Sequence, residues 1–471
     1  MTPLLNNFDY TTYLSAFTTR YGSPGMRKIW SEENKRLLWR RLWISLAKAE
    51  AKAGLVSKEE LEDIITHQHD INIALSKERE TKVYHELMAE IQVFSESCKI
   101  GGGKIHLGTT STDILDNTTA LQIKASLSLV KNNLKKLLRL FSEKMKTYKD
   151  TACIGYTHLQ PAEPTTLGYR FAFYAQDLLL DLQMLEIVEK TIKGKGLKGA
   201  VGTSASFDVL LKNSNVSPGQ LEKDFLTELD LDAVEISNQT YPRKLDLLVI
   251  EVLANIAASM NKFCFDYRIM QSPLFGEWME KRNTERVGSS AMPFKRNPDR
   301  AEKVCSLCRV VSNFLPLAWD NPANSLLERT LDDSAAQRIF LPEAFLALDD
   351  CLENTIILLE NLEINMQSVT KNLATYGQFS ATESLLMDLV KKGAHRQTMH
   401  EKIKELSFLA WTDVQQGKQN PLKTLFIHDK TILSFLSAKD IEAQFNALSH
   451  IGLAKERTEK CIKTLQKYLR L

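Results

Sequence analysis

The chain has little net charge and few cysteines, and each scarcity narrows its possible functions. Sixty basic residues against 58 acidic ones leave a formal net charge of +2. That balance gives no broad field for attracting nucleic acid, so any phosphate site must be built locally. The 7 cysteines are an odd number spread from Cys98 to Cys461, which fits a reducing compartment better than a disulfide framework.

A long uninterrupted hydrophobic run is also lacking. The strongest apolar stretch, Leu245 to Met260, contains Asp246 and Glu251, so it predicts a core helix rather than a membrane span. The first residues, MTPLLNNFDY, have neither the basic start nor the apolar stretch of a signal peptide. Together with the cysteine usage, these features lead us to expect a cytoplasmic protein.

Long helical patterns dominate what is present. Apolar residues recur at steps of three and four over Thr112–Lys149 and again over Leu245–Tyr267. Thr166–Lys190 and Asp333–Leu362 are two further long candidates, the second with an expected kink at Pro342. No convincing alternating strands lie between them. The sequence therefore predicts an all-α fold, an elongated bundle of long helices.

The long-helix pattern begins near residue 111 and ends near residue 364. We therefore expect an N-terminal helical domain over 1–111, a central long-helix bundle over 112–364 and a C-terminal helical domain over 365–471. Helices of ~30 residues span roughly 45 Å, so loops at opposite ends of the bundle lie far apart. This separation favours a functional site that is shared between subunits.

The segment Gly288–Pro298, with the sequence GSSAMPFKRNP, has the most unusual composition of the loops. Its glycine and prolines keep it out of a helix, so it can bring hydroxyls, amide donors and one cation to a single point. Such a cluster suits an oxyanion that forms when a proton leaves the carbon beside a carboxylate. Lys295 and Asn297 can both reach that oxygen. Either Ser289 or Ser290 is then the candidate base, provided that its hydroxyl is activated locally.

Two earlier segments carry side chains suited to the same chemistry. His158, in the sequence GYTHLQPA, is a natural acid for protonating a departing nitrogen near neutral pH, although a lone histidine is more often structural. Thr110 and Ser111, in the sequence HLGTTSTD, stand where a long helix is predicted to begin. Such hydroxyls either cap the helix or bind a carboxylate at its positive end, and the residues alone favour capping.

Taken together, the three segments resemble the conserved regions of the fumarase/aspartase superfamily, whose members eliminate fumarate from a substituted succinate. The resemblance implies that Ser289 is the base and that His158 is the general acid, oriented by Glu302. It implies further that Lys295 and Asn297 stabilise the aci-carboxylate that forms on proton removal. No metal and no organic cofactor is implied.

Other segments resemble the adenylosuccinate lyases within that superfamily. RYGSP near the start resembles their phosphate-contacting segment, and ERTLDDS with the arginine that follows it matches them closely. Ser334 and Arg338 are four residues apart and share a helix face, where both can contact one phosphate. The substrate-binding residues that the resemblance implies are Arg20, Tyr21, Tyr84, His85, Glu86, Thr110, Ser111, Gln239, Asn297, Lys303, Arg329, Ser334 and Arg338.

Two of these positions depart from the family. Glu86 follows His85 where the family has aspartate, and Lys303 stands where relatives have arginine. Lysine supplies the charge but not the planar fork of a guanidinium. No histidine stands four residues after His85, which argues against a metal site there.

The resemblance implies a small-molecule nucleotide substrate and a homotetramer with sites shared between subunits, and no nucleic-acid or membrane partner. The implied reaction releases fumarate from adenylosuccinate to give AMP and, by family analogy, from the succinylated aminoimidazole carboxamide ribotide of purine biosynthesis. Argininosuccinate lyase is the nearest rival, and the arginine-rich segments favour a nucleotide instead. A structural protein recruited from the superfamily is the other alternative, against which the intact Ser289, Lys295 and His158 argue.

Overall fold

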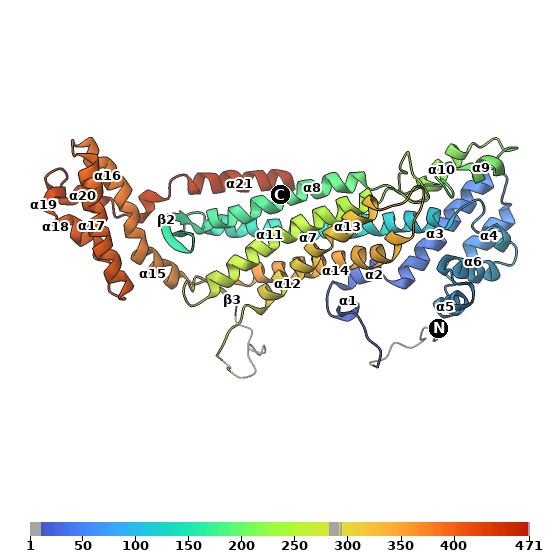
Figure 1. Cartoon of the computed structure of the whole chain (residues 1–471), viewed down its shortest axis with the longest axis horizontal. Coiled ribbons are helices and arrows are strands. Elements are labelled where there is room, and N and C mark those ends of the chain that lie inside the picture. Colours follow the sequence, from blue (N-terminus) through green and yellow to red (C-terminus); the bar gives the residue numbers. More distant parts are fainter. Residues whose placement is uncertain (1–10, 282–291, 293, 470–471) are drawn as a thin grey trace. The chain divides into compact units, whose positions relative to one another are not determined.

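The computed structural model describes residues 11–281, 292 and 294–469. Helices make up most of it, which confirms the predicted all-α fold (Figure 1). Its residues group into two compact units. Unit 1 comprises Met1–Asn133, Asp181–Ala258 and Ser306–Glu353, and unit 2 comprises Leu134–Leu180, Ser259–Cys305 and Asn354–Leu471. The three-domain division expected from the sequence stays a prediction.

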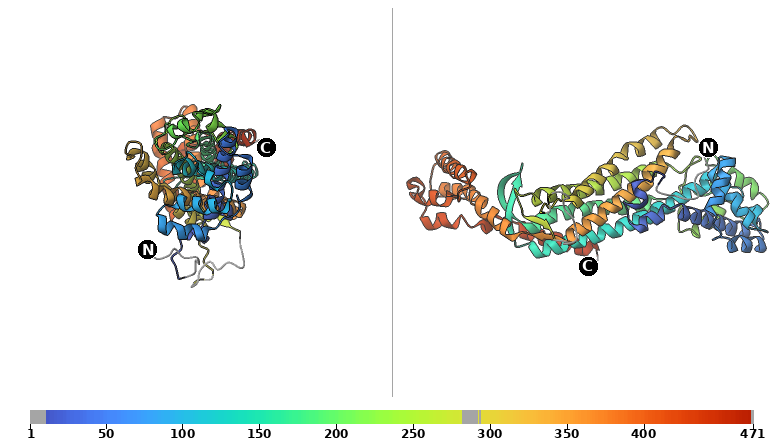
Figure 2. Two further views of the ribbon diagram at one scale, coloured as in Figure 1. Left: turned by 90° about the vertical axis from the view of Figure 1, so that its right-hand side faces the viewer. Right: turned by 90° about the horizontal axis from the view of Figure 1, so that it is seen from below.

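Four long helices contribute residues to both units, and all four were predicted from apolar periodicity. They are α7 (Ser111–Tyr148), α8 (Leu167–Thr191), α11 (Lys244–Gln271) and α14 (Asp332–Glu360). They run alongside one another in Figure 1 and in the right-hand view of Figure 2. Pro342 lies inside α14.

Helix α11 is long and apolar enough to cross a membrane by length and composition alone. However, 61% of its most apolar window is buried inside the protein, and a core helix passes the same test. Val249, Ile256, Met260 and Phe263 along it are all buried. Their burial agrees with the core helix that the sequence predicts.

The shorter helices of unit 1 begin at residues whose side chains satisfy free backbone amides. Ser23, Ser31 and Ser57 each cap a helix in this way, and Ser57 forms a capping box with Glu60. The helices are α1 (Ala16–Thr19), α2 (Pro24–Ile29), α3 (Glu32–Lys52), α4 (Lys58–Thr66), α5 (Ile73–Val83), α6 (Glu86–Ser97), η1 (Gly102–Lys104), α9 (Ala205–Leu210), α10 (Pro218–Thr227) and α13 (Leu315–Ala323); α12 (Asp299–Asn313) begins in unit 2.

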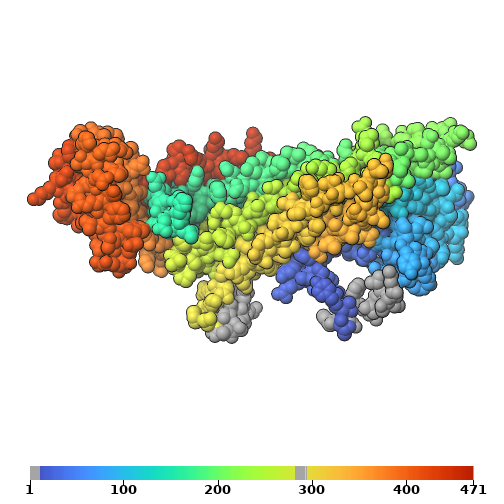
Figure 3. Space-filling model, in the orientation of Figure 1, coloured from blue at the N-terminus to red at the C-terminus, as the bar shows by residue number. Residues whose placement is uncertain are grey.

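Unit 2 ends in a set of short helices around a core of their own, seen as one lobe in the space-filling view (Figure 3). That core includes Leu385, Met399, Leu406 and Phe426. Its buried residues come from α16 (Ala381–Lys391), α17 (Arg396–Gln415), α18 (Leu422–His428), α19 (Lys430–Leu433), α20 (Ala438–Ala443) and the turns between them. The other elements of unit 2 outside the long helices include β3 (Trp278–Glu280) paired with β4 (Leu362–Ile364), α15 (Met366–Tyr376), η2 (Gly377–Ser380), η3 (Ala447–His450) and α21 (Ala454–Leu469).

One element differs from the prediction. The sequence shows no convincing strands between the long helices, whereas the structure has an antiparallel hairpin of β1 (Ala152–Thr157) and β2 (Gln160–Thr166) ahead of α8. Pro161 and Pro164 lie in β2, and proline cannot donate a hydrogen bond to a sheet ladder. A two-stranded hairpin consists only of edge strands, so its prolines can face away from the partner. Gly155 lies at a bulge where a Cβ would come within 2.8 Å of the Glu163 carbonyl oxygen.

Candidate active site

The predicted site residues divide between the two units. Unit 1 holds the candidates for substrate binding Arg20, Tyr21, Tyr84, His85, Glu86, Thr110, Ser111, Gln239, Arg329, Ser334 and Arg338. Unit 2 holds His158, Lys295, Asn297, Glu302 and Lys303. The proposed base, Ser289, and its neighbour Ser290 lie outside the described residues.

The start of α7 is held by a carboxylate rather than by its hydroxyls. Asp113 is fully buried, and its Oδ2 accepts a hydrogen bond of 3.0 Å from the Thr110 amide. This is the backward half of a capping box, because the acidic side chain three residues on satisfies the amide of the capping residue. The Thr110 hydroxyl makes no hydrogen bond with the described residues.

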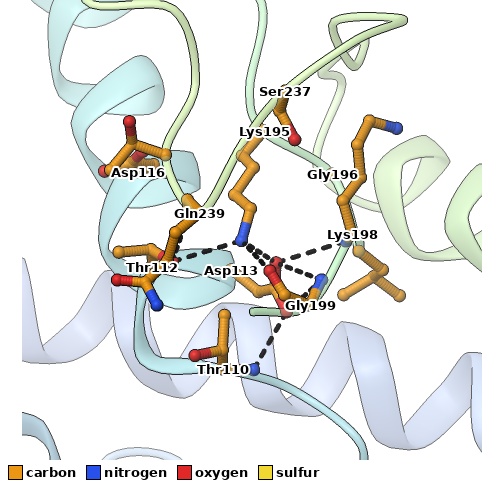
Figure 4. Close-up of polar contacts among 12 residues, drawn as sticks. Thr110, Thr112, Asp113, Asp116, Lys195, Gly196, Lys198, Gly199, Ser237 and Gln239 are labelled. Carbon is orange, nitrogen blue, oxygen red and sulfur yellow. Dashed lines mark hydrogen bonds and ion pairs between the residues drawn. The ribbon is translucent and has the colours of Figure 1, made fainter. Parts of the chain in front are cut away.

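A buried lysine completes this arrangement (Figure 4). The Lys195 ammonium lies 2.7 Å from Asp113 Oδ1, and both side chains are fully buried. It also donates to Thr112 Oγ1 at 3.2 Å, and the Thr112 hydroxyl in turn donates to the Gln239 carbonyl oxygen at 2.5 Å. Burial lowers the pKa of Lys195, and the Asp113 carboxylate opposes that shift.

His85 lies beside Ser111. Its Nδ1 accepts a hydrogen bond from the Met88 amide at 3.3 Å, and its Nε2 lies 3.3 Å from Ser111 Oγ. Because Nδ1 is the acceptor, the neutral ring carries its proton on Nε2 and donates it to the serine. Tyr84, just before His85, is 75% exposed and has a left-handed backbone with a φ of 55°.

Glu86 connects three cations. Its carboxylate lies 2.8 Å from Lys35, 3.1 Å from Arg36 and 3.2 Å from Arg338. Burial alone would raise its pKa, but Lys35, Arg36 and Arg338 together lower the pKa of Glu86 to about 2. Adjacent residues therefore reach both ends of the predicted site: His85 contacts Ser111 and Glu86 contacts Arg338.

A second buried network holds Arg329. Its guanidinium lies 2.8 Å from Asp333 Oδ1, and the other oxygen of Asp333 lies 2.5 Å from Arg243 Nε. Arg243 also contacts Asp116 of α7 at 3.2 Å. Burial alone would lower the pKa of Arg243, but the surrounding acidic groups, Asp116 first among them, raise it well above its usual value. The Gln239 amide donates to the Glu328 carbonyl at 3.1 Å, next to Arg329.

The other nucleotide-end candidates of unit 1 have looser surroundings. Arg20 is exposed and makes no side-chain hydrogen bond or ion pair with the described residues, whereas the Tyr21 ring packs edge-on against Phe17 at 5.8 Å. Ser334 and Arg338 both lie on α14, one turn apart, as predicted. Arg338 is 59% exposed at its side chain.

In unit 2, His158 lies at the tip of the β1–β2 hairpin. Thr157 pairs with Gln160, so His158 and Leu159 form a two-residue turn, with φ values of 54° and 60°. Left-handed conformations at two successive residues define a type I′ turn, which normally takes asparagine and glycine. The His158 side chain is exposed. The turn therefore presents a strained histidine outward, a feature typical of functional sites.

Glu277 anchors the base of the hairpin. Its buried carboxylate lies 3.2 Å from Arg170 of α8 and accepts a hydrogen bond of 3.0 Å from Asn372 of α15. Arg170 also donates to the Ile154 carbonyl of β1 at 2.7 Å. The strands that carry His158 are thus fixed to α8 and α15, although the histidine itself projects away.

The remaining candidates of unit 2 lie at or before the start of α12. Lys295 is exposed, and its amide donates to the Met292 carbonyl at 3.0 Å; Asn297 and Lys303 are half-buried. Glu302 is exposed and lies 3.7 Å from the Arg268 guanidinium. Within the described part of the chain no contact joins Glu302 to His158, so their pairing stays a prediction.

The sequence reasoning missed several buried charged residues, among them Lys195, Arg243, Asp113, Asp116 and Asp333. Asp113 lies within the segment HLGTTSTD, Asp116 follows it, and Asp333 lies within ERTLDDS, but these segments drew attention for other residues. Asp113 offered a local signal, because an acidic residue three positions after a helix-capping threonine is a capping-box pattern. Nothing local shows that Lys195 meets Asp113, since 82 positions separate them and only the fold brings them together.

Comparisons with known proteins place the chain among the lyases. The lyase family model matches residues 12–312, and the model for the adenylosuccinate lyase C-terminus matches residues 378–461. The fold is shared with 3-carboxy-cis,cis-muconate lactonizing enzyme from Pseudomonas putida (TM-score 0.84, 21% identity, 96% of this chain and 99% of that one). Fumarate lyase from Mesorhizobium sp. BNC1 is similar (TM-score 0.81, 20% identity, 96% and 99% covered). At these identities the structures establish the fold alone.

Curated relatives narrow the class. Adenylosuccinate lyase of Schistosoma mansoni is 34% identical over 426 residues, which cover 89% of this chain and 88% of that protein. Adenylosuccinate lyase of Saccharomyces cerevisiae is 33% identical over 475 residues, with 98% of each chain covered. The chain belongs to the adenylosuccinate lyase family.

Proposed function

We propose that this chain is an adenylosuccinate lyase, which eliminates fumarate from adenylosuccinate and releases AMP. The observation that carries the proposal, besides family membership, is the pair His85–Glu86. Through it, Ser111 at the predicted carboxylate end and Arg338 at the predicted phosphate end belong to one connected cluster. By family analogy the succinylated aminoimidazole carboxamide ribotide is a second substrate in purine biosynthesis.

In the proposed reaction, Ser289 removes a proton from the succinyl carbon beside a carboxylate. The electron pair is held first as an aci-carboxylate, whose extra negative charge Lys295 and Asn297 stabilise. The pair then forms the double bond of fumarate as the carbon–nitrogen bond breaks. His158 delivers a proton to the departing nitrogen, and Glu302 favours the protonated form of its ring. These steps use acid–base and electrostatic catalysis, and no cofactor is invoked.

The two ends of the substrate meet different groups in unit 1. Thr110, Ser111 and the side chain of Gln239 bind the succinyl carboxylates at the start of α7, where the helix dipole favours negative charge. The phosphate is bound by Arg329, Ser334 and Arg338, with Arg20, Tyr21 and Lys303. His85, Glu86 and Tyr84 lie between these ends. Arg338 is kept near the site by Glu86 until the phosphate arrives.

The working enzyme is proposed to be a homotetramer whose sites combine residues of several subunits. In support, α8 carries a row of apolar side chains that the described residues leave 36% to 56% exposed: Tyr169, Phe173, Leu180, Met184 and Ile187. Such a row marks an association surface. The exposed His158 fits the same arrangement. A cytoplasmic location and the absence of nucleic-acid or membrane partners complete the proposal.

The function is tested by fumarate release from the purified protein, with adenylosuccinate and argininosuccinate as parallel substrates and Ser289→Ala as the inactive control. We expect release from adenylosuccinate only. Release from argininosuccinate alone would mean that the arginines of unit 1 were misassigned. If a folded oligomer released no fumarate from either substrate, the chain would be better explained as a structural protein recruited from the superfamily.

A further inference from the structure

Lys195 is surrounded on all sides by protein and has no direct place in the proposed reaction. Its ammonium has three N–H donors, and each has an acceptor: Asp113 Oδ1 at 2.7 Å, the Gly199 carbonyl at 2.8 Å and Thr112 Oγ1 at 3.2 Å. Lysine is almost never fully buried unless it is paired in this way. Because every N–H donor of Lys195 has an acceptor, the lysine holds the three groups that accept these hydrogen bonds in one arrangement.

Asp113 extends this arrangement to the backbone. Besides Lys195, its carboxylate accepts hydrogen bonds from the amides of Lys198 and Gly199, both at 3.2 Å, and of Thr110 at 3.0 Å. The carboxylate thus ties the segment 194–199 to the first turn of α7. Asn117, one turn further along α7, bonds to both backbone groups of Gly196, at 3.0 and 3.1 Å.

The close approach of this segment to α7 requires glycine. A Cβ at Gly194 would lie 2.1 Å from Asn117 Oδ1, and Gly196 and Gly199 have φ values of +80° and +70°. These glycines let the chain fold closely around the lysine. The segment is consequently fixed by its own backbone geometry as well as by the ion pair.

The third segment reached from Lys195 carries Gln239. The Thr112 hydroxyl accepts a hydrogen bond from Lys195 and donates its own to the Gln239 carbonyl (Figure 4). The backbones of Thr110 and Gln239, whose side chains are proposed to bind the succinyl end, are therefore both connected to one ammonium group through a single intermediate side chain. The arginines at the phosphate end instead contact Asp333 and Glu86, which are not partners of Lys195.

We propose that Lys195 is a positioning residue for the succinyl end of the substrate: with Asp113 it fixes the backbone of Thr110, and through Thr112 it fixes the backbone of Gln239. This inference rests on the proposed function and adds that separate networks position the residues for the two halves of the substrate. Loss of Lys195 should weaken binding of the dicarboxylate half without weakening binding of the nucleotide half.

The two products separate the two halves experimentally. Fumarate and AMP are each used as inhibitors of adenylosuccinate cleavage by wild type and by Lys195→Met, which keeps an unbranched side chain and removes the ammonium group. We expect the inhibition constant of fumarate and the KM of adenylosuccinate to rise by about tenfold, a change of ~1.4 kcal/mol. The inhibition constant of AMP should stay within about twofold of wild type, a difference of ~0.4 kcal/mol.

Lys198→Met is the matched control. Lys198 lies on the same segment and is nearly buried, but its ammonium pairs with Glu222 at 2.8 Å instead of with Asp113. Fumarate inhibition should be unchanged in this variant. If Lys195→Met does not fold, Thr112→Val removes the link to Gln239 and leaves the ion pair intact, and a selective loss of fumarate binding is expected there too.

Two results would overturn the inference, because each describes a merely structural lysine. In the first, the inhibition constants of fumarate and of AMP rise by the same factor. In the second, both inhibition constants are unchanged and only the fraction of active enzyme is smaller. Those outcomes leave the proposed function standing, since wild type would still turn over. Absence of fumarate release by wild type would overturn the proposed function and this inference together.

Discussion

The two units of the chain treat their candidate residues in opposite ways. In unit 1, Thr110, Gln239 and Arg329 are held through buried partners within the same chain, by the networks around Lys195 and Arg243. In unit 2, His158 and Lys295 project into solvent from a hairpin tip and from the segment before α12. These three groups, which are proposed to bind substrate, are therefore fixed in advance, whereas the two groups proposed to protonate the leaving nitrogen and to stabilise charge are exposed.

This contrast has a physical reason. A binding group improves affinity when its position is fixed before the ligand arrives, because no ordering cost remains. A general acid and a loop that covers an oxyanion must instead meet substrate from another side. Outward presentation is therefore what a site completed by neighbouring subunits requires, and the exposed apolar row on α8 supplies a surface for that association.

The largest expected effect on activity comes from replacing His158, the candidate general acid of unit 2. His158→Asn keeps a residue that tolerates the left-handed turn but cannot donate the proton. We expect kcat to fall by about 10² to 10⁴, which is the usual contribution of general acid–base catalysis. The midpoint of urea unfolding should be unchanged because the side chain is exposed. A large loss of stability would mean that the histidine is structural, contrary to the account.

Two arginines of unit 1 test the other side of the comparison. Arg329→Ala and Arg338→Ala should each weaken AMP inhibition by about tenfold or more, the usual cost of a lost hydrogen bond to a charged group. Arg329→Ala should also lower the urea midpoint, because Arg329 is a partner of the buried Asp333. Arg338→Ala should leave the midpoint nearly unchanged, since its pair with Glu86 is exposed on the arginine side. If both variants lowered the urea midpoint by the same amount, the distinction between a buried Arg329 network and an exposed Arg338 pair would be contradicted.

A pH-dependent effect concerns Glu50, a buried carboxyl group of unit 1 outside the candidate site. Burial raises its pKa to about 9, against an attraction to Lys104 that lowers it. Above a pH of about 4.5 the unfolded chain loses this proton while the folded chain keeps it, up to about pH 9. The free energy of unfolding should therefore fall as the pH rises through that window, by at most ~1.4 kcal/mol per pH unit from this group.

Glu50→Gln removes the titrating group and keeps its size. The stability of this variant relative to wild type should increase between pH 6 and pH 8, as measured by urea unfolding. Glu33→Gln, on the exposed face of the same helix α3, is the control and should show no such trend. An identical difference between Glu50→Gln and wild type at both pH values would contradict a protonated Glu50.

The long helices were predictable because their apolar residues repeat every three to four positions for many turns, a signal that local chemistry alone carries. The hairpin around His158 was not, since Pro161 and Pro164 obscure its strands and its turn uses His158 and Leu159 where asparagine and glycine are usual. The motif residues of the site could be named from family resemblance. Lys195 and Arg243 could not, because their roles come from partners far away in the sequence.

The central claim is that the outward-facing groups of unit 2 are completed only when several copies of the chain assemble. It is tested most directly by dissociating the inactive variants His158→Asn and Ser289→Ala, mixing them and reassociating them. Mixed oligomers are predicted to regain a substantial share of wild-type fumarate release, because some sites then take His158 from one copy and Ser289 from another. A mixed oligomer as inactive as either variant alone would contradict the account.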